Sequence, residues 1–501
     1  MLIVAALTAV GVALRLAVAH QSLFADELST RYLLAGRGLD DVVSIVHTDA
    51  EITPPLYFVA SWLTTRIDFS PELLRAPSLI AGALTIPLVY RLGLRTVGHR
   101  AALVAAALTT FSPFMIYYSA EARGYGLMMV LVLGSTLCLL NAVEDGRSRW
   151  WWAAYAACTC AAVYTHYTSV FALFGQFAWV LWAHPAARRA AIVWTVIAAV
   201  GFLPWLSGLR GDLDSPTTDI LSALSPFVYG YVKSSLVHWA IAFPYLLEGT
   251  SVRGLPGIPA LVALAIALAL GLAGLTAAAL RGRLRRPDRT LVLVIVLAVS
   301  VPAGTALVSA VGSNLFGTRN LAASWPAFAL CLAALLVAAG PRLGIAAAAL
   351  AIGAFAVGGL KMLDKDYGRP QYDAAIAFAD RNAEPGDVVV DGVSLIPGGV
   401  PSVIDLDFAG RHRVYPLGRS EVRYDPFRIL SAPPPTPDVV ERAAAAARGG
   451  RLLMFLGPGG APAREALDAV PPGFRRVAAR RYAGINRIEV VVLEDQTASG
   501  A

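Results

Sequence analysis

The chain has 501 residues, of which 57% are hydrophobic and 15% charged, and its formal net charge at pH 7 is +7. Soluble domains carry roughly 25% charged residues, so this composition excludes an ordinary soluble protein and predicts that most of the chain faces lipid. The cations are nearly all arginines in short loops between apolar runs, which is typical of polytopic membrane proteins and does not indicate a nucleic-acid partner.

About eleven apolar runs are long enough to span a bilayer, at roughly 17–25 residues each. The arginine-bearing loops between them fall on one side, which the positive-inside rule assigns to the cytoplasm. The first run lacks a basic leader and a cleavage site, so we interpret it as a retained helix. A shorter apolar stretch, 234–248, is interpreted as interfacial or re-entrant. The predicted spans are 2–20, 73–92, 100–117, 123–143, 150–166, 168–184, 189–207, 256–280, 290–311, 321–340 and 342–360.

The first outer loop, residues 20–72, begins with two adjacent carboxylates, Asp26 and Glu27. Desolvating one carboxylate beside another is costly, so the pair points to chemistry more than to packing. A solvated loop that starts an amphipathic helix is the alternative interpretation. We expect the loop to lie on the membrane as short interfacial helices, one of them over 56–65 after the tandem proline Pro54–Pro55.

Three further outer segments carry side chains suited to a substrate that is half lipid and half polar: 121–125, 165–168 and 314–320. Arginine can hold a phosphate bidentately, carboxylates can deprotonate or position hydroxyl groups, and aromatic rings can stack on a sugar. We predict that these segments converge with the first outer loop. The candidates are Arg123 and Arg319 for a phosphate, and Glu121, Tyr125, His166, Tyr167 and Tyr57 for a sugar or acceptor.

Each of these residues also has a purely structural interpretation. Arg123 could form a local ion pair with Glu121, Arg319 could be an interfacial anchor, and His166 could simply satisfy the end of a helix. His47, with the carboxylates at 49 and 51, could bind a divalent cation, although the sequence commits to no metal site.

Arg15 lies inside the first predicted span. A charge at that depth must find a partner or water, and we expect a carboxylate to provide it.

The composition changes at Lys361, where charges, prolines and glycines become frequent. Alternating helix and strand patterns predict a small soluble α/β domain over 361–501, following a membrane domain over 1–360. The glycine-rich run at 457–461 has the spacing of neither a Walker loop nor a dinucleotide fingerprint, so we interpret it as a turn. Predicted strands are 387–391, 451–456 and 488–493, and predicted helices 372–382, 438–448 and 463–470.

The membrane domain resembles the GT-C class of polytopic glycosyltransferases, in the broad family of dolichyl-phosphate-mannose protein mannosyltransferases and bacterial aminoarabinose transferases of lipid A. The resemblance rests on the pair Asp26–Glu27 after the first span, the turn at 54–57 and the turn at 118–125. The segment 165–167 and the turn at Arg319 add to it. It covers about residues 1–340, and it implies a helical GT-C fold.

The resemblance also implies a reaction. A sugar such as mannose or arabinose would pass from a polyprenyl-phosphate donor to a glycan, lipid or protein acceptor at the outer face of the cytoplasmic membrane. Asp26 matches the family's catalytic aspartate, which implies a general base in an inverting displacement, with Glu27 beside it. The resemblance further implies a multi-pass protein whose C-terminal domain is extracytoplasmic. We predict no particular cofactor, and binding of a divalent cation stays an open alternative. The alternatives are a polyprenyl-linked glycan ligase or polymerase, a transporter or flippase of a lipid-linked sugar, and a non-catalytic relative.

Overall fold

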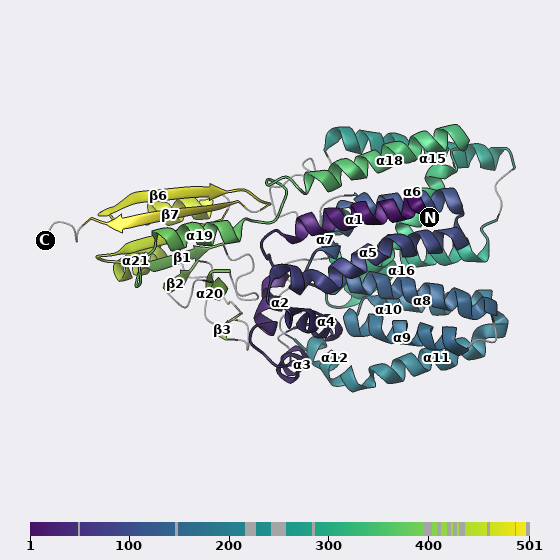
Figure 1. The fold of residues 1–501 in the computed structure, drawn as a ribbon, viewed down its shortest axis with the longest axis horizontal. Helices are drawn as coiled ribbons and strands as arrows, with labels where there is room; N and C mark the ends of the chain where they lie inside the picture. Colours follow the sequence, from purple (N-terminus) through teal and green to yellow (C-terminus); the bar gives the residue numbers. More distant parts are fainter. Residues whose placement is uncertain are drawn as a thin grey trace. The chain divides into compact units, whose positions relative to one another are not determined.

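The computed structural model divides the chain into two compact units (Figure 1). The first unit contains Met1–Ala19 and Gly38–Leu363, and the second contains His20–Arg37 and Asp364–Ala501. A boundary near residue 360 is the sequence expectation, but the segment His20–Arg37, with Asp26 and Glu27, is grouped with the C-terminal part of the chain. The residues described are 1–48, 51–145, 149–215, 227–241, 257–282, 286–393, 403–407, 412–417, 422–423, 428–429, 436–457, 461–485 and 487–496.

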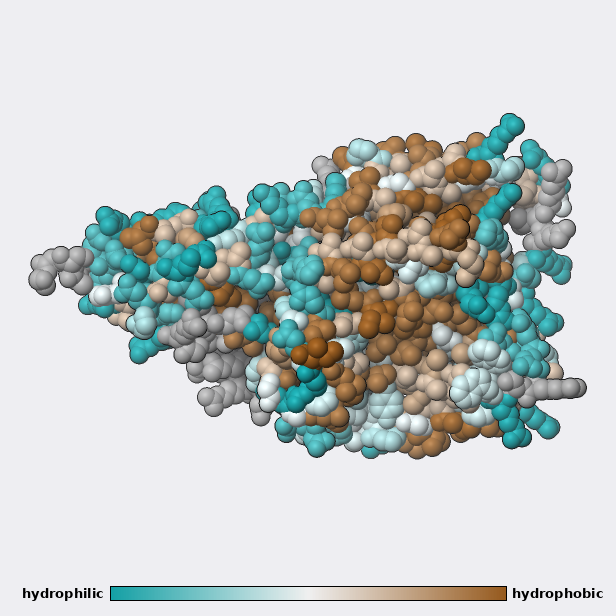
Figure 2. All heavy atoms as spheres, in the orientation of Figure 1, coloured by the Kyte–Doolittle hydropathy of each residue, from teal (hydrophilic) through white to brown (hydrophobic). Residues whose placement is uncertain are grey.

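The first unit is a bundle of helices. Its long helix α5 packs against α1, α6 and α8, and α10 packs against α16. Figure 2 shows hydrophobic side chains over much of the surface of these helices, as expected for a lipid-facing unit. The helices are α1 (Leu2–Ala19), α3 (Leu39–His47), α4 (Leu56–Thr65), α5 (Pro71–Thr96), α6 (His99–Phe111), α7 (Pro113–Ser119), α8 (Tyr125–Asp145), α9 (Arg149–Thr165), α10 (Ser169–Ala183), α11 (Arg188–Phe202), α12 (Leu206–Leu213), α14 (Tyr229–Ile241), α15 (Ile258–Leu280), α16 (Arg289–Val311), α17 (Trp325–Val337) and α18 (Pro341–Lys361), with 3-10 turns η1 (Pro185–Ala187), η2 (Leu203–Trp205) and η3 (Arg319–Ser324).

Among the described residues, 8 helices are long and apolar enough to cross a membrane, or up to 9 if the bent pair α6–α7 counts as one span. Each of the runs predicted from the sequence is helical. The two predicted spans that fall outside this count correspond to α9, with 17 residues, and α10, with 15 residues. At about 1.5 Å per residue both are shorter than a hydrocarbon core of about 30 Å. The expected polytopic helical fold is confirmed.

The bend between α6 and α7 measures 60° and follows from Pro113. Proline has no N–H to donate to the carbonyl of Thr109, so this carbonyl needs another partner. Arg15 of α1 supplies it: Nη2 lies 3.2 Å from the Thr109 oxygen, and Nη1 lies 3.0 Å from the Gly11 oxygen. The expectation of a carboxylate partner for Arg15 is therefore corrected. Arg15 donates to these two main-chain carbonyls instead.

The second unit is built on a 5-stranded sheet in the order β2-β1-β5-β7-β6. Strand β1 is parallel to β2 and β5, whereas β7 is antiparallel to β5 and β6. Helix α21 packs on β1 and β2, and α19 packs on β6 and β7. The small C-terminal sheet domain predicted from the sequence is confirmed. The elements are α2 (Asp26–Leu34), α19 (Tyr372–Asn382), β1 (Val388–Gly392), α20 (Val403–Asp407), β2 (Arg413–Pro416), the separate pair β3 (Val422–Arg423) and β4 (Arg428–Ile429), α21 (Thr436–Ala446), β5 (Arg451–Leu456), α22 (Ala461–Asp468), β6 (Phe474–Tyr482) and β7 (Ile488–Asp495).

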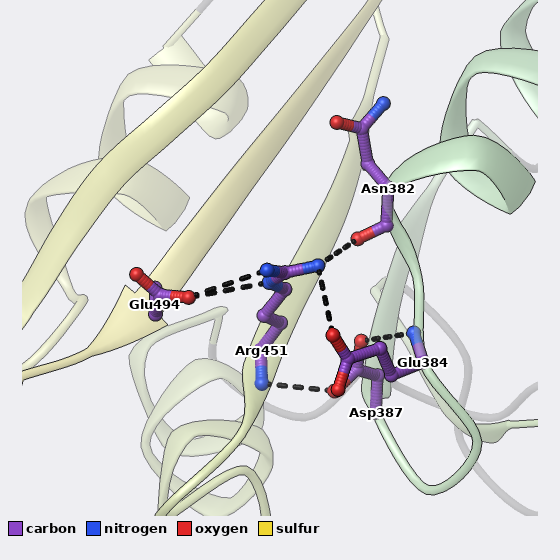
Figure 3. A network of polar contacts seen from close by, with 5 residues as sticks. All are labelled: Asn382, Glu384, Asp387, Arg451 and Glu494. Atoms are coloured by element: carbon purple, nitrogen blue, oxygen red, sulfur yellow. Dashed lines mark hydrogen bonds and ion pairs between the residues drawn. The ribbon is translucent and has the colours of Figure 1, made fainter. Parts of the chain in front are cut away.

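A polar network fastens the start of β5 to its neighbours (Figure 3). Arg451 donates from Nη1 to the Asn382 carbonyl at the end of α19, at 2.9 Å, and lies 3.4 Å from Glu494 of β7. Its main-chain N–H donates to Asp387 at 3.0 Å. One partly exposed arginine thus ties α19, β5 and β7 together. Of the run at 457–461, residues 458–460 lie outside the described residues.

Two glycines of α18 allow the close packing of helices in the first unit to be tested. A Cβ added at Gly359 would lie 2.6 Å from the main-chain oxygen of Phe111, whereas one at Gly353 would meet nothing within 4 Å. We expect Gly359→Ala to destabilise the purified protein by about 1–3 kcal/mol through overpacking. Gly353→Ala should be neutral or slightly stabilising, because alanine favours a helix. Thermal unfolding in detergent measures both, and equal melting temperatures would contradict this packing.

Candidate functional site

The turn between α7 and α8 contains Glu121 and Arg123 and is buried on all sides. Ser78 of α5 donates to the Arg123 carbonyl at 2.7 Å. On the other side, a Cβ at Gly124 would lie 2.9 Å from the carbonyl oxygen of Thr165, so only glycine allows the end of α9 to come this close. The turn is therefore held between α5 and α9, and the direction of the Arg123 side chain is fixed.

Arg123 forms a bidentate ion pair with Glu51, a residue of the first outer loop. Its Nη1 and Nη2 lie 2.7 and 2.8 Å from the two carboxylate oxygens, and both side chains are almost completely buried, at 7% and 6% exposed. Thr53 donates to Glu51 at 2.7 Å, and the guanidinium lies 5.5 Å from the Phe58 ring centroid. The local pairing considered for Arg123 was with Glu121; the bidentate partner is Glu51, and the sequence held no signal for it.

A row of aromatic side chains leads away from this turn. The ring centroids of Tyr117 and Tyr118 are 5.3 Å apart, those of Tyr118 and Tyr125 are 5.0 Å apart, and those of Tyr125 and His166 are 5.3 Å apart. Phe114 continues the row at 4.6 Å from Tyr118. Two of the predicted residues, Tyr125 and His166, are thus brought together beside Arg123.

His166 lies in the turn between α9 and α10, outside both helices. Its Nδ1 is 3.3 Å from the main-chain nitrogen of Thr168 and 2.9 Å from the Thr168 hydroxyl. Because a main-chain N–H can only donate, Nδ1 acts as an acceptor and Nε2 carries the proton. Burial, together with the positive charges of Arg123 and Arg319, lowers the pKa of His166 to about 3. His166 is therefore a neutral hydrogen-bond donor at physiological pH.

Tyr167 forms a second polar group with Asp212 and Trp205, of which the sequence predicted only Tyr167. Its hydroxyl donates to Asp212 of α12 in a short hydrogen bond and accepts one from Trp205 at 3.1 Å. Burial, followed by the negative charge of Asp212, raises the pKa of Tyr167. Asp212 is itself buried, at 4% exposed. It lies in α12, two residues before Asp214, and nothing in the sequence distinguishes it from that neighbouring aspartate.

Tyr57 and Arg319 have different surroundings. The hydroxyl of Tyr57 donates to the Leu74 carbonyl at 2.9 Å, and the side chain is buried between α4 and α5. Arg319 begins η3 and is partly exposed. Tyr57 therefore serves the packing of the first outer loop, whereas Arg319 keeps access to solvent.

The residues considered for a divalent cation have other contacts. Nε2 of His47 is 2.9 Å from the Ser207 hydroxyl, and Glu51 pairs with Arg123. The third candidate, Asp49, lies outside the described residues. In the part of the chain that the structure describes, no group of three or more histidines, cysteines, aspartates or glutamates could hold a metal ion.

Asp26 and Glu27 open helix α2 in the second unit, and their surroundings differ. Glu27 is completely buried; its Oε2 lies 3.1 Å from Nε of Arg369 and accepts the N–H of Phe24 at 3.2 Å. Asp26 is partly exposed, in the first turn of the helix. A carboxylate is favourable there because of the helix dipole. The residue before it, Ala25, has φ 51° and ψ −123° and has the only positive φ among the described non-glycine residues.

The comparisons with known proteins agree with this architecture. Residues 53–207 match the family model described as dolichyl-phosphate-mannose-protein mannosyltransferase. The chain is also similar to ArnT from Cupriavidus metallidurans. For ArnT bound to undecaprenyl phosphate, the identity is 12%, the match covers 99% of this chain and 97% of ArnT, and the TM-score is 0.53. For apo ArnT the identity is 12%, the match covers 99% of both chains, and the TM-score is 0.54. No curated protein matches the chain.

The structural match to ArnT extends over nearly the whole of both chains, and ArnT is a GT-C glycosyltransferase. This chain therefore has the GT-C fold, the architecture of polytopic glycosyltransferases, and the prediction from the sequence is confirmed. The match to the mannosyltransferase family falls on the part of the first unit that carries Arg123, His166 and Tyr167.

The neutral state of His166 predicts how stability depends on pH. Its pKa is about 3 in the folded protein against an ordinary value of 6.5, so below pH 6.5 the unfolded chain takes up a proton that the folded protein does not. Stability should fall between pH 6.5 and 3, by about 2 kcal/mol at pH 5 from this group alone. We expect the melting temperature to fall less between pH 7 and pH 5 in His166→Asn than in the wild type. The exposed control His20→Asn should behave as wild type, and an unchanged pH dependence in His166→Asn would contradict a buried neutral imidazole.

Proposed function

We propose that the protein is an integral-membrane glycosyltransferase that moves a sugar from a polyprenyl-phosphate donor to an acceptor hydroxyl at the outer face of the cytoplasmic membrane. The observation that carries this proposal is the partly exposed Asp26, set in the first turn of α2 behind a strained residue, in a chain with the GT-C fold. The similar protein ArnT was crystallised with undecaprenyl phosphate, which supports the donor class. In this proposal the C-terminal domain is extracytoplasmic, and the acceptor is a glycan, lipid or protein.

The proposed reaction is a single inverting displacement. Asp26 takes the proton of the acceptor hydroxyl while the hydroxyl oxygen forms a bond to the anomeric carbon. The bond from that carbon to the phosphate oxygen breaks, and its electron pair leaves with the polyprenyl phosphate. Cationic donors near the phosphate lower the barrier because they stabilise the negative charge that develops there. Glu27 is buried against Arg369, so we assign the base to Asp26 alone.

Arg319 is the better placed of the two candidates for the donor phosphate. It is partly exposed, and its charge acts on His166. Arg123 has both Nη atoms on Glu51, so it can contact a phosphate only if the phosphate displaces that carboxylate. The Nε2–H of His166 and the ring of Tyr125 are suited to hold the sugar, because one donates a hydrogen bond and the other offers an aromatic face.

Replacing Asp26 tests the proposed base. Asp26→Asn keeps the size of the side chain but cannot accept a proton, so we expect sugar transfer to fall by roughly 10²–10⁴-fold while the variant folds normally. The matched control is Asp40→Asn, which changes an exposed aspartate in the first turn of α3. The measurement is transfer of radiolabelled sugar from polyprenyl-phosphate donors by the purified protein. Turnover near the wild-type rate in Asp26→Asn would falsify the assignment.

Removing both members of the Arg123–Glu51 pair separates a role in substrate contact from a role in folding. If the pair were only structural, the double variant Glu51→Gln, Arg123→Gln would leave no buried charge unpaired and should recover much of the activity lost in Arg123→Gln. Because Glu51 occupies both Nη atoms of Arg123, we expect the double variant to fold and to recover much of this activity; a folded but inactive double variant would instead indicate that the pair contacts the substrate. The control is Arg95→Gln, which removes an ion pair with Glu144 between α5 and α8, at 2.6 Å. Recovery of transfer in the double variant would rule out substrate contact by this pair.

A further inference from the structure

We propose that Arg369, which follows the membrane-spanning part of the chain, is a positioning residue for Asp26. It acts with Tyr372 and Asp373 to hold the turn at residues 24–27 in a strained conformation that sets the direction of the Asp26 carboxylate. The inference rests on the proposed function, because it concerns the residue assigned as the base. It gives the C-terminal part of the chain a role in the reaction that the fold alone does not assign.

The strain lies at Ala25, directly before Asp26. Its φ of 51° and ψ of −123° belong to a region that glycine enters freely and that an alanine side chain disfavours. Such a conformation persists only where the surrounding structure enforces it, and it is found mainly at functional sites. If Ala25 relaxed to an ordinary φ, the chain would enter α2 in another direction, and Asp26 would move with it.

Phe24 and Glu27, which lie on either side of Ala25, both contact residues 369–372. On one side, the ring of Phe24 stacks on Tyr372 with centroids 6.5 Å apart. On the other side, Glu27 pairs with Arg369 at 3.1 Å, where the side chains are 0% and 1% exposed. The same Glu27 oxygen accepts the N–H of Phe24 and so closes the turn around Ala25.

Two further contacts, at Gln21 and Ser22, add to this clamp between residues 24–27 and 369–373. Ser22 donates to the Asp373 carboxylate at 2.9 Å and accepts the Asp373 N–H at 3.2 Å. The N–H of Arg369 donates to the Gln21 side chain at 3.0 Å. The segment 21–27 therefore meets residues 369–373 through reciprocal hydrogen bonds, a buried ion pair and a ring contact.

The clamp can resist the strain because residues 368–373 are themselves fixed to the sheet. The N–H of Ile485, beyond the end of β6, donates to the Gly368 carbonyl at 2.9 Å. A Cβ at Gly484 would lie 2.7 Å from Cα of Pro370, so the two backbones are in close contact. Tyr372 is buried at the start of α19, which packs on β6 and β7. The backbone on both sides of Arg369 is thus fixed by residues 484–485, and Arg369 can keep Glu27 in place.

The test combines removal of the clamp with removal of the strain. Arg369→Gln should lower kcat by about 10²-fold, the cost of a misplacement of about 1 Å, with the KM for the donor nearly unchanged. Adding Ala25→Gly makes the native conformation accessible without strain, so the double variant should recover at least about 10-fold in kcat. Arg451→Gln is the matched control, because it removes an arginine that bridges elements of the same unit (Figure 3). It should change kcat less, and Ala25→Gly should give it no rescue.

Hydrogen exchange of residues 20–37 provides a readout independent of activity. In the full-length Arg369→Gln variant, exchange should accelerate in this segment and stay unchanged in α8 and α9. Unchanged kcat with unchanged exchange would overturn the inference, as would equal rescue of Arg451→Gln by Ala25→Gly. If Arg369→Gln does not fold, Ser22→Ala decides: faster exchange at 20–37 with lower kcat supports the clamp, and wild-type behaviour overturns it. An inactive wild type would contradict the proposed function, and the exchange data would then still decide whether the clamp exists.

Discussion

The ion pair between Glu27 and Arg369 joins residues far apart in the sequence and excludes both charges from water. Breaking such a pair by removing one partner typically costs about 3–5 kcal/mol, because the remaining charge stays buried. The helix that begins at Asp26 depends on this contact, since Glu27 also accepts the N–H that closes the turn before it. The two adjacent carboxylates therefore do different work. Glu27 holds the backbone, whereas Asp26 is partly exposed and is the residue proposed as the base.

The first unit also contains a buried ion pair between distant segments, at Arg123. Its pair with Glu51 connects the first outer loop to the turn before α8, and the neutral His166 adds a hydrogen-bond donor without adding another buried positive charge. A protonated imidazole there would repel Arg123 and Arg319. Arg319 is partly exposed, and in the proposed reaction this exposure suits the departure of a phosphate more than a closed ion pair does.

Sequence reasoning located the features that depend on local pattern. The helical runs followed from hydrophobicity, which is a property of neighbouring residues, and β1, β5 and β7 followed from short runs of branched apolar residues. Strand β6 was missed because its exposed arginines conceal the alternation, as often happens at the edge of a sheet. The runs predicted at 150–166 and 168–184 match α9 and α10 to within one residue at each end.

The partners of the candidate residues were harder to predict, because they depend on contacts between distant segments. Arg123 was named, but Glu51 was considered only as a metal ligand. Neither Asp212 nor Arg369 was proposed as a candidate residue. No periodicity connects such pairs, and only the folded backbone brings them within hydrogen-bond distance. Ala25 gave no signal at all, since positive φ is associated with glycine or asparagine.

The clamp also bears on how the two parts of the chain depend on each other. The segment His20–Arg37 is inserted in sequence between α1 and α3 of the first unit, yet it is grouped with the second. A chain cut after Leu363 would leave Glu27 without Arg369 and Phe24 without Tyr372. The turn would lose the contacts that hold Ala25, and the cost of its conformation would favour relaxation. The C-terminal domain is therefore better understood as part of the support for Asp26 than as a separable appendage.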